Sequence, residues 1–419
     1  MRRTSLGLTA ALTLLLPSDA LGQTVAWIDQ FGSGGIDVAN GVVATTTDVY
    51  VAGYTYGVLP GEANAGGVDA FLRRVDSQGN EVWQVQFGTS GDEGASGVAM
   101  DATGLYVAGF IDGRFPGEAK VGSEDGFLAK YGFDGTPVWV AQFGTRQWDS
   151  AWNVVADGSG VYVSGYTEGV FPGEVKLGSG DLFFLTRFTA DGEQDWITQF
   201  GSSGGDSPDA SAIGPSGVVV AGETHGRLPG QRPRGAGDVV VATVDLDGVV
   251  SWMRLFGTRE VDQGSGVVAD GTGVYVTGST DGVFKGQRDR PSTDAFVRKL
   301  DGLDGQTLWT RQFGTRAADY CKNAALVVGE VACVGNTYGV LAGQTSSGGY
   351  DIFVKTFDAS TAEPGFTLSF GGRSYEAPRG AATSTGRLYV AGYTEGRFPG
   401  QSSLGDVDAF VTGIDLSDS

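Results

Sequence analysis

Short runs in which apolar and polar residues alternate fill the chain, four to a unit. In the first unit these runs cover residues 37–45, 48–55, 69–76 and 81–87, and Gly, Asp or Asn residues separate them. β-Branched and aromatic residues with a period of two are typical of half-buried strands. The chain beyond residue 22 shows no helical periodicity. The pattern therefore predicts an all-β protein built from four-stranded units.

A Phe-Gly pair marks the end of the fourth strand in every unit. The pair recurs at intervals of 56 or 57 residues, at Phe31, Phe87, Phe143, Phe200, Phe256, Phe313 and Phe370. Four residues before each Phe lies another aromatic residue: Trp27, Trp83, Trp139, Trp196, Trp252, Trp309 and Phe366. Positions i and i+4 of a strand face the same side, so both rings should pack against the next unit. Four-stranded repeats of this size are typical of β-propellers, and seven Phe-Gly pairs predict seven blades.

The two ends of the repeat array complete each other. Residues 24–32 contain only the fourth strand of a unit, whereas residues 408–419 end after a third strand. Pairing these two strands closes the ring and removes exposed strand edges. We therefore expect one domain over residues 23–419, a seven-bladed propeller closed by its N-terminal strand.

The repeated segments resemble a known bacterial repeat. VYVAGYTYG (49–57) and DAFLRRVDSQGNEVWQVQFG (69–88) are similar to the SBBP-type β-propeller repeat, and the resemblance extends over all seven units, with Ala332 at a tyrosine position of the sixth. The resemblance implies an exported bacterial protein, secreted or on the cell surface, with no defined activity. The ending D-x-x-G-x-x-x-W also resembles the tryptophan-docked blades of quinoprotein-type propellers, although no cofactor signature accompanies it.

Charge and the N-terminal segment narrow the choice of partners. The net charge is −21, which argues against nucleic acids and anionic membranes because both bind basic surfaces. Residues 1–22 have the charged start, apolar middle and small-residue exit of an export signal. No later run approaches the roughly 20 apolar residues of a membrane span. We expect a monomer without a membrane span that is secreted, periplasmic or on the cell surface.

The only two cysteines are Cys321 and Cys333. Export favours a disulfide between them. The predicted strand register, however, places them about three residues out of step on neighbouring strands, beyond the ~7 Å Cα separation that a disulfide spans. The sequence therefore favours two buried thiols, while the disulfide stays open as the alternative.

Two acidic positions recur in every unit. The first follows the Phe-Gly glycine by five residues and comprises Asp37, Glu93, Asp149, Asp206, Asp262, Asp319 and Glu376. The second opens the third strand and comprises Asp69, Asp125, Asp181, Asp238, Asp294, Asp351 and Asp408. Two rings of carboxylates predict a calcium site as one hypothesis, because hard cations take several oxygen ligands. The other hypothesis, which the repetition favours, is that each carboxylate accepts backbone N–H groups within its own loop.

Long loops join the second and third strands, and alternation of strand direction places them at the same end as the connectors between blades. We expect the ligand face at that end, because binding residues concentrate on long loops over a rigid frame. Departures from the repeat are the best candidates there. They are the cations Arg227, Arg232, Arg234, Lys285, Arg288 and Arg290 of adjacent loops, and the two tryptophans outside the repeat, Trp148 and Trp152. Arginine forks suit carboxylate or phosphate groups, and exposed tryptophans stack on sugars or protein partners.

Three functional hypotheses remain. The leading one is a binding or scaffold propeller for an extracellular protein or glycan, without a cofactor. The second is a glycan hydrolase or lyase that uses paired carboxylates; we expect an enzyme to show raised carboxyl pKa values in an asymmetric pocket. The third is a structural surface protein stabilised by calcium. The regular carboxylates nominate no catalytic pair, and the lone His225 supports no histidine-based metal site.

Overall fold

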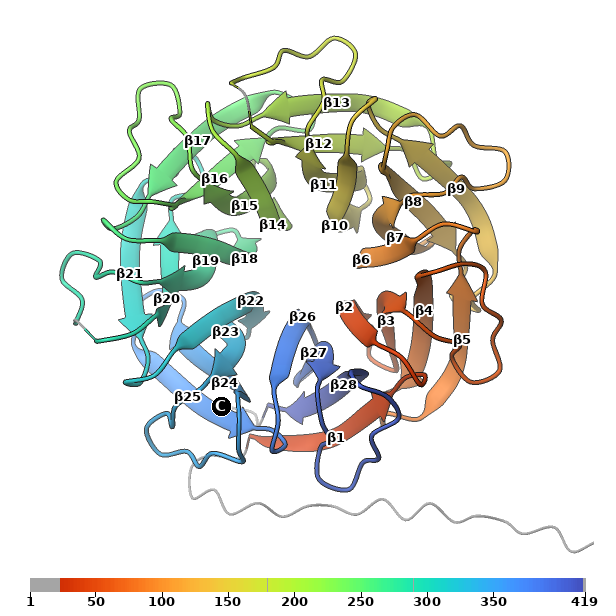
Figure 1. The fold of residues 1–419 in the computed structure, drawn as a ribbon. Helices are drawn as coiled ribbons and strands as arrows, with labels where there is room; N and C mark the ends of the chain where they lie inside the picture. Colours follow the sequence, from red (N-terminus) through yellow and green to blue (C-terminus); the bar gives the residue numbers. More distant parts are fainter. Residues whose placement is uncertain (1–22, 179, 289, 417–419) are drawn as a thin grey trace, which may run out of the picture.

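The computed structural model describes residues 23–178, 180–288 and 290–416, which form seven four-stranded antiparallel sheets arranged around an axis (Figure 1). The predicted seven-bladed, all-β propeller is confirmed. In every blade the first strand lies next to the axis and the fourth lies at the rim (Figure 1).

The strands follow the same order in each blade. Blade 1 consists of β2 (Asp37–Ala44), β3 (Asp48–Thr55), β4 (Asp69–Asp76) and β5 (Glu81–Phe87). Blade 2 consists of β6 (Glu93–Asp101), β7 (Gly104–Ile111), β8 (Asp125–Tyr131) and β9 (Pro137–Phe143). Blade 3 consists of β10 (Asp149–Asp157), β11 (Gly160–Thr167), β12 (Leu182–Phe188) and β13 (Gln194–Phe200). Blade 4 consists of β14 (Asp206–Gly214), β15 (Gly217–Thr224), β16 (Asp238–Val244) and β17 (Val250–Phe256).

The remaining blades continue the pattern around the ring. Blade 5 consists of β18 (Asp262–Asp270), β19 (Gly273–Thr280), β20 (Asp294–Leu300) and β21 (Thr307–Phe313). Blade 6 consists of β22 (Asp319–Val327), β23 (Glu330–Thr337), β24 (Asp351–Asp358) and β25 (Pro364–Phe370). Blade 7 consists of β26 (Glu376–Ser384), β27 (Arg387–Thr394), β28 (Asp408–Asp415) and β1 (Thr24–Phe31). Antiparallel pairing of β1 with β28, from Thr24 opposite Asp415 to Phe31 opposite Ala409, closes the ring as predicted.

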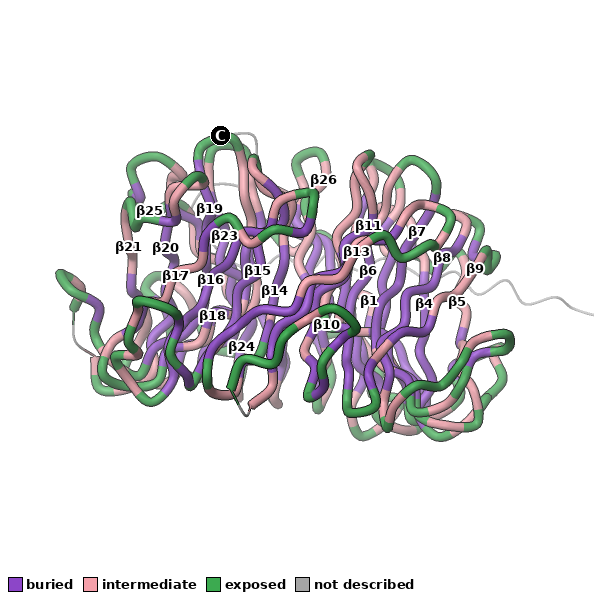
Figure 2. Tube along the Cα trace, turned by 90° about the horizontal axis from the view of Figure 1, so that it is seen from above, coloured by how far each residue is buried: buried purple, intermediate pink, exposed green. Residues whose placement is uncertain are grey.

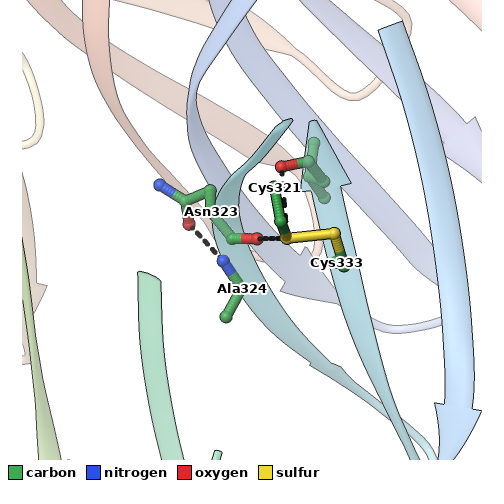
Figure 3. Close-up of a disulfide and its surroundings, with 5 residues drawn as sticks. Cys321, Asn323, Ala324 and Cys333 are labelled. Atoms are coloured by element: carbon green, nitrogen blue, oxygen red, sulfur yellow. Dashed lines mark hydrogen bonds between the residues drawn. A yellow bond between two sulfur atoms is a disulfide. The ribbon is translucent and has the colours of Figure 1, made fainter. Parts of the chain in front are cut away.

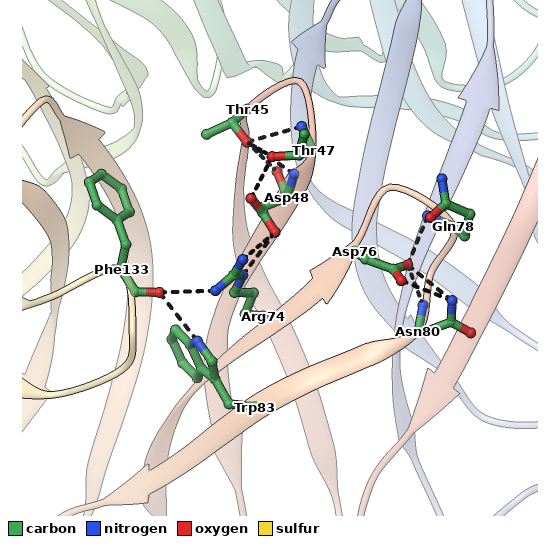
Figure 4. Close-up of polar contacts among 9 residues, drawn as sticks. All are labelled: Thr45, Thr47, Asp48, Arg74, Asp76, Gln78, Asn80, Trp83 and Phe133. Atoms are coloured by element: carbon green, nitrogen blue, oxygen red, sulfur yellow. Dashed lines mark hydrogen bonds and ion pairs between the residues drawn. The ribbon is translucent and has the colours of Figure 1, made fainter.

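The repeated aromatic residues hold neighbouring blades together. Trp27 and Phe31 of β1 pack in one buried cluster with Phe71 of blade 1, so the predicted stripe against the next unit is confirmed. The indole N–H also reaches the next blade's turn between its third and fourth strands: Trp83 Nε1 lies 3.3 Å from the Phe133 carbonyl oxygen (Figure 4). The same bond joins Trp27 to Ser77, Trp139 to Ala190, Trp196 to Leu246 and Trp252 to Gly302.

The glycine of that turn is needed for two reasons. Gly79 has a φ of +84°, in the left-handed region that favours glycine. A Cβ atom at Gly79 would also lie 2.5 Å from the Trp27 ring. Beside it, Asp76 accepts hydrogen bonds from the backbone N–H groups of Gln78 and Asn80, each at 2.9 Å, and so holds the turn open for the indole (Figure 4).

Loops occupy both ends of the ring, and buried strands lie between them (Figure 2). The connectors between blades lie at the same end as the long loops between second and third strands, because Ile36 pairs with Val407 and Tyr375 with Tyr350 in isolated parallel bridges. The shared end that the strand order predicts is therefore confirmed. The long loops project outward at the rim (Figure 1).

Every first strand carries a β-bulge that inserts one extra residue. In β2 the register moves from Ala39 opposite Gly53 to Gly41 opposite Ala52, which leaves Asn40 as the additional residue. The corresponding residues are Ser96, Trp152, Asp209, Ser265, Lys322 and Arg379. A bulge re-aims a side chain and increases the local twist.

The expectation of two unpaired cysteines is wrong. Cys321 and Cys333 form a disulfide between β22 and β23, with their Cα atoms 5.7 Å apart (Figure 3). The sequence register assumed a regular ladder, but the bulge at Lys322 intervenes. Cys321 lies opposite Gly335 and Cys333 lies opposite Ala324, so the cysteines are diagonal neighbours across a locally twisted ladder.

The predicted export signal, residues 1–22, lies outside the described residues. Among the residues that are described, no helix is long and apolar enough to cross a membrane.

Candidate ligand-binding site at the mouth of the central channel

The seven bulged residues converge on the axis of the ring. Together they line a cavity of about 880 Å³, and we call them the bulge ring: Asn40, Ser96, Trp152, Asp209, Ser265, Lys322 and Arg379. Each stands at the same place in its blade, yet the seven side chains include an amide, two hydroxyls, an indole, a carboxylate and two cations. A repeated scaffold thus presents a non-repeated set of side chains to one cavity, whose volume lies within the usual range for small-molecule sites.

Opposite charges face the channel without forming contact ion pairs. Within the described chain, no ion pair joins Asp209 to Lys322 or Arg379, although both cations influence the Asp209 carboxyl electrostatically. Burial raises the pKa of Asp209 to about 7, while Lys322 and Arg379 oppose that rise. Burial lowers the pKa of the Lys322 ammonium, and the neighbouring Arg379 lowers it further. These charges therefore influence one another without direct contact.

Two buried polar atoms of the cavity lining have no hydrogen-bond partner among the described residues. They are Oδ2 of Asp209 and Oγ of Ser211, both on β14 and both in the cavity lining. Ser211 is only 7% exposed. A buried polar atom without a partner costs roughly 1–3 kcal/mol, so this wall of the cavity is prepared for a partner from outside the chain.

Five tyrosines of blades 6 and 7 form a continuous chain of rings. We call Tyr320, Tyr338, Tyr350, Tyr375 and Tyr393 the tyrosine arc. The ring centroids of Tyr350 lie 4.9 Å from Tyr338, 5.0 Å from Tyr375 and 6.5 Å from Tyr320, and Tyr375 lies 5.9 Å from Tyr393. Tyr338 is 62% exposed. None of the five lines the cavity, but Tyr320 and Tyr393 contact two cations that do.

The two cations of the cavity lining, Lys322 and Arg379, contact two tyrosines of the arc. The Lys322 ammonium lies 4.9 Å from the centroid of the Tyr320 ring, and the Arg379 guanidinium lies 5.5 Å from that of Tyr393. Such cation–π contacts hold the charged groups near the ring faces. A ligand that packs on the arc would thus place its anionic groups next to two cations.

Blade 3 and its neighbouring loop form another part of the wall. Trp152, 39% exposed, meets Tyr166 edge to face with centroids 6.0 Å apart. Glu124, from the long loop of blade 2, also lines the cavity with Ser150. Burial raises the pKa of Glu124 to about 7 against a hydrogen bond from Ser150. Two carboxyl groups with raised pKa values, Glu124 and Asp209, therefore lie in one asymmetric cavity.

The two predicted acidic rings lie elsewhere, buried beneath the loops. The first-ring residues Asp37, Glu93, Asp149, Asp206, Asp262, Asp319 and Glu376 are all 4% exposed or less. In the second ring, Asp69, Asp125, Asp238, Asp294, Asp351 and Asp408 are 1% exposed or less, whereas Asp181 is half-buried just before β12. These carboxylates do not form an open acidic surface.

Local hydrogen bonds explain why the acids recur. Asp149 accepts from the Thr145 backbone N–H at 2.5 Å and from the Thr145 hydroxyl at 2.8 Å. Asp125 accepts from the Val121 N–H at 2.8 Å and from the Gln142 amide at 2.8 Å. These contacts agree with the hypothesis that each carboxylate accepts backbone N–H groups within its own loop. Among the described residues, no group of three or more His, Cys, Asp or Glu side chains is placed to hold a metal ion.

The two rings meet at the Phe-Gly glycine. A Cβ atom at Gly88 would lie 2.5 Å from Asp69 Oδ1 and 2.7 Å from Glu93 Oε2, so only glycine fits between the two acids. Burial raises the pKa of Glu93, and the Asp69 charge adds to that rise. For Glu376 burial raises the pKa to about 7. The carboxylate pairs are thus repeated features of the interfaces between blades.

The predicted cationic cluster lies at the rim and does not line the channel. Arg227, Arg232, Arg234, Lys285 and Arg288 are exposed on the long loops of blades 4 and 5, and Arg290 is paired with Asp294 at 3.4 Å. A second cavity, of about 840 Å³, brings Arg288 and Arg290 together with Arg316 of the next connector. The six predicted cations are therefore divided, and Arg316 is an additional residue that the sequence reasoning missed.

The two non-repeat tryptophans also separate. Trp148 lies in the connector before blade 3, is 49% exposed and forms a backbone bridge with Glu124. Trp152 lies inside β10 as its bulged residue. His225 lies on the exposed loop of blade 4 with Nε2 3.4 Å from Glu223 Oε1.

Of the bulge ring, the sequence analysis identified only Trp152, and it missed the tyrosine arc. A signal for the ring is present, because each bulged residue follows the first-ring acid by three positions. The residue before it is Ala, Pro, Gly or Cys in every blade, while this position changes from blade to blade.

Comparison with known proteins agrees with this architecture. The family model for the SBBP beta-propeller repeat matches residues 251–285, from β17 into the long loop of blade 5. The chain carries an SBBP repeat. The resemblance inferred from the sequence is therefore supported by a match within one repeat length.

Among curated proteins, the regulatory protein FlaEY of Caulobacter vibrioides is 26% identical over 427 residues, covering 90% of this chain and 43% of that protein. The chain thus spans less than half the length of this relative. Among solved structures, the WD40 β-propeller domain of Doa1 has a TM-score of 0.51 at 10% identity, covering 93% of this chain and 97% of that one. BamB from Moraxella catarrhalis has a TM-score of 0.45 at 12% identity, covering 94% and 100%. At these identities the structural likeness shows the fold alone.

Proposed function

We propose that this protein is an exported binding propeller that holds its ligand at the mouth of the central channel. The observation that carries the proposal is the bulge ring: seven equivalent backbone positions place seven side chains of mixed chemistry in one cavity. The scaffold does not require this variety, because the same bulge accommodates serine, asparagine, tryptophan and charged residues. Binding to an extracellular protein or glycan would require it.

The tyrosine arc supports the same location. Exposed tyrosines supply apolar contact area and a hydroxyl group at low conformational cost, which suits recognition of sugars and protein segments. The curated relative is named a regulatory protein, which fits a binding role, although this chain covers less than half of it. Export, which rests on residues 1–22, belongs to the proposal and is tested by N-terminal sequencing of protein recovered from the bacterial envelope and medium.

A steric block of the channel tests the binding site. Ser96→Trp places in blade 2 the residue that blade 3 already carries at the same bulge, so the backbone can accommodate the ring. The variant and the wild type are applied to arrays of immobilised oligosaccharides and synthetic peptides. Leu303→Ala is the control, because Leu303 is 80% exposed in a turn at the opposite end. We expect Ser96→Trp to lose the retained ligand and Leu303→Ala to keep it; equal retention by both variants, or no ligand for the wild type, contradicts the proposal.

The second candidate function is hydrolysis or lysis of a glycan. Glu124 and Asp209 favour it, since both line the cavity and burial raises the pKa of each to about 7, a value suited to acid–base catalysis. Incubation of each retained oligosaccharide with wild type, Glu124→Gln and Asp209→Asn distinguishes the two candidates. Cleavage that both substitutions abolish favours the enzyme, whereas binding without cleavage favours the binding propeller.

Calcium stabilisation is the third candidate. It is favoured by buried acid oxygens without a hydrogen-bond partner among the described residues, including Oδ1 of Asp69, Asp149 and Asp238. Each interface supplies two carboxylates, fewer oxygen ligands than the six to eight that calcium takes, so backbone carbonyls or water would have to complete a site. A thermal melt of metal-stripped protein with and without calcium tests this candidate.

A further inference from the structure

The charged residues that line the channel indicate the chemical class of its ligand. Lys322 and Arg379 come from adjacent blades 6 and 7, whereas the acid Asp209 comes from blade 4. One side of the mouth therefore attracts an anionic group and the other accepts hydrogen bonds. Lys322 and Arg379 line the cavity and form no contact ion pair among the described residues, so both are available to a negative group of a ligand.

The rest of the lining favours a ligand that both donates and accepts hydrogen bonds. Asn40, Ser96, Ser265 and Asn153, which carry amide or hydroxyl groups, line the cavity. Ser211 Oγ and Asp209 Oδ2 are buried there without partners. Sugar hydroxyls donate to carboxylates and both donate to and accept from serine, so one saccharide ring can satisfy several of these atoms.

The tyrosine arc supplies the third component. Aromatic rings pack against the apolar C–H face of a sugar while their hydroxyl groups stay available for hydrogen bonds. The cation–π contacts of Lys322 with Tyr320 and of Arg379 with Tyr393 place both positive charges at the edge of that surface. A sugar ring lying on the arc with a carboxylate substituent would bring that carboxylate to the two cations.

We propose that the channel mouth binds an acidic oligosaccharide containing uronate residues. Its carboxylate lies between Lys322 and Arg379, its ring packs on the tyrosine arc, and its hydroxyl groups donate to Asp209 and Ser211. This inference rests on the proposed function, because it specifies the ligand of the same site. A peptide with acidic side chains would satisfy the cations, but it offers fewer hydroxyl groups for the opposite wall.

Isothermal titration with three matched probes tests the ligand class. The probes are a galacturonate or mannuronate trimer, the neutral maltotriose and the acidic peptide triglutamate. We expect one uronate trimer to bind at least about tenfold more tightly than the other two probes, since one charge-assisted hydrogen bond contributes about 1.5–3 kcal/mol. Tighter or equal binding of maltotriose or triglutamate overturns the inference and leaves the binding propeller intact.

Substitutions locate the interaction. Lys322→Met and Arg379→Met keep the aliphatic stems and remove the charges, so each should weaken uronate binding by about tenfold or more. Arg259→Met is the control, because Arg259 is an exposed cation at the same end of the ring but outside the cavity lining. Tyr338→Ala should weaken binding as well, since its ring is the most exposed of the arc. Melting temperatures verify that every variant is folded.

Uronate binding that is unchanged in Lys322→Met and Arg379→Met overturns the inference, because the anion is then held elsewhere. Failure of both uronate trimers to bind folded wild-type protein also overturns it. In that case the array experiment with Ser96→Trp still decides the proposed function independently, because it does not depend on a uronate ligand.

Discussion

Replacing Gln142 with leucine removes three hydrogen bonds that join the loop, strand and acid of blade 2. The side-chain amide donates to Asp125 Oδ2 at 2.8 Å and to the Gly113 carbonyl oxygen at 3.2 Å, and its oxygen accepts from the Phe115 N–H at 3.2 Å. Gln142 is only 9% exposed, so water does not replace these partners freely. Equivalent amides join Gln30 to Asp408, Gln86 to Asp69 and Gln312 to Asp294.

The expected loss follows from the groups left without partners. Each buried polar group that loses its partner costs roughly 1–3 kcal/mol, and the buried leucine side chain offsets part of that cost. We therefore expect the free energy of unfolding to fall by about 3 kcal/mol. With an unfolding entropy of about 2.1 cal/mol/K per residue, a chain of this length should melt about 4 °C lower. Leucine itself is tolerated at this position, because blade 4 carries Leu255 there.

Differential scanning calorimetry measures the change. Gln147→Leu is the control, because Gln147 has an exposed side chain in the neighbouring connector. Gln142→Glu provides a second test, since it places a carboxylate beside Asp125 and should destabilise the protein more at pH 8 than at pH 5. A Gln142→Leu melting temperature within about 1 °C of wild type would refute the reasoning that these amides brace the acidic ring.

Four further predictions concern other parts of the structure. Replacing both Cys321 and Cys333 with serine should lower the free energy of unfolding by about 3 kcal/mol, because the bond restricts the unfolded chain, and thiol titration should find no free thiol in the wild type. Burial raises the pKa of Asp209 from 3.8 to about 7. The folded protein therefore holds this proton more tightly than the unfolded chain, and the stability it contributes is complete below about pH 4 and lost as the pH rises through about 7. Asp209→Asn should flatten the stability–pH profile in that window when measured by urea denaturation. Deleting residues 24–31 should lower the melting temperature of the whole ring, since β28 then loses its antiparallel partner; an unchanged melt would contradict closure by β1. Adding calcium to metal-stripped protein should leave the melting temperature unchanged if the acids brace their own loops, and a large upward shift would assign them to metal binding instead.

The sequence was sufficient for the architecture because the repeated residues have repeated structural roles. Trp83 and Gly135 recur together since the indole packs over the glycine turn of the next blade, with a Cβ atom at Gly135 only 3.1 Å from the ring. Gln142 and Asp125 recur together because the Gln142 amide donates a hydrogen bond to the Asp125 carboxylate. Spacing between such residues therefore predicted the number of blades and the closure of the ring, and the alternating pattern predicted the strand boundaries of the first unit within about one residue.

The site was harder to predict because it depends on residues that do not repeat and on a local irregularity. The alternating pattern assigns Asn40 and its equivalents to a regular strand face, whereas the bulge turns them to the axis. The bulge at Lys322 also shifts the pairing of β22 with β23, which is why the regular register wrongly separated the two cysteines. Rows of cations such as Arg232 and Arg288 were visible in the sequence, but the distance of their loops from the axis was not.

The tyrosine arc was missed for a related reason. Tyr350 belongs to a long loop and Tyr375 to the connector of the next blade, and they meet through a single parallel bridge with their centroids 5.0 Å apart. No spacing within one repeat relates these positions. Only the three-dimensional arrangement of neighbouring blades brings the rings together.

A crystal structure of the protein grown with a uronate trimer tests the central claim most directly. The account predicts a saccharide at the mouth of the channel, with its carboxylate between Lys322 and Arg379 and a sugar ring against the tyrosine arc. A trimer bound at the rim beside Arg288 and Arg316, with the channel mouth free of saccharide, would contradict it.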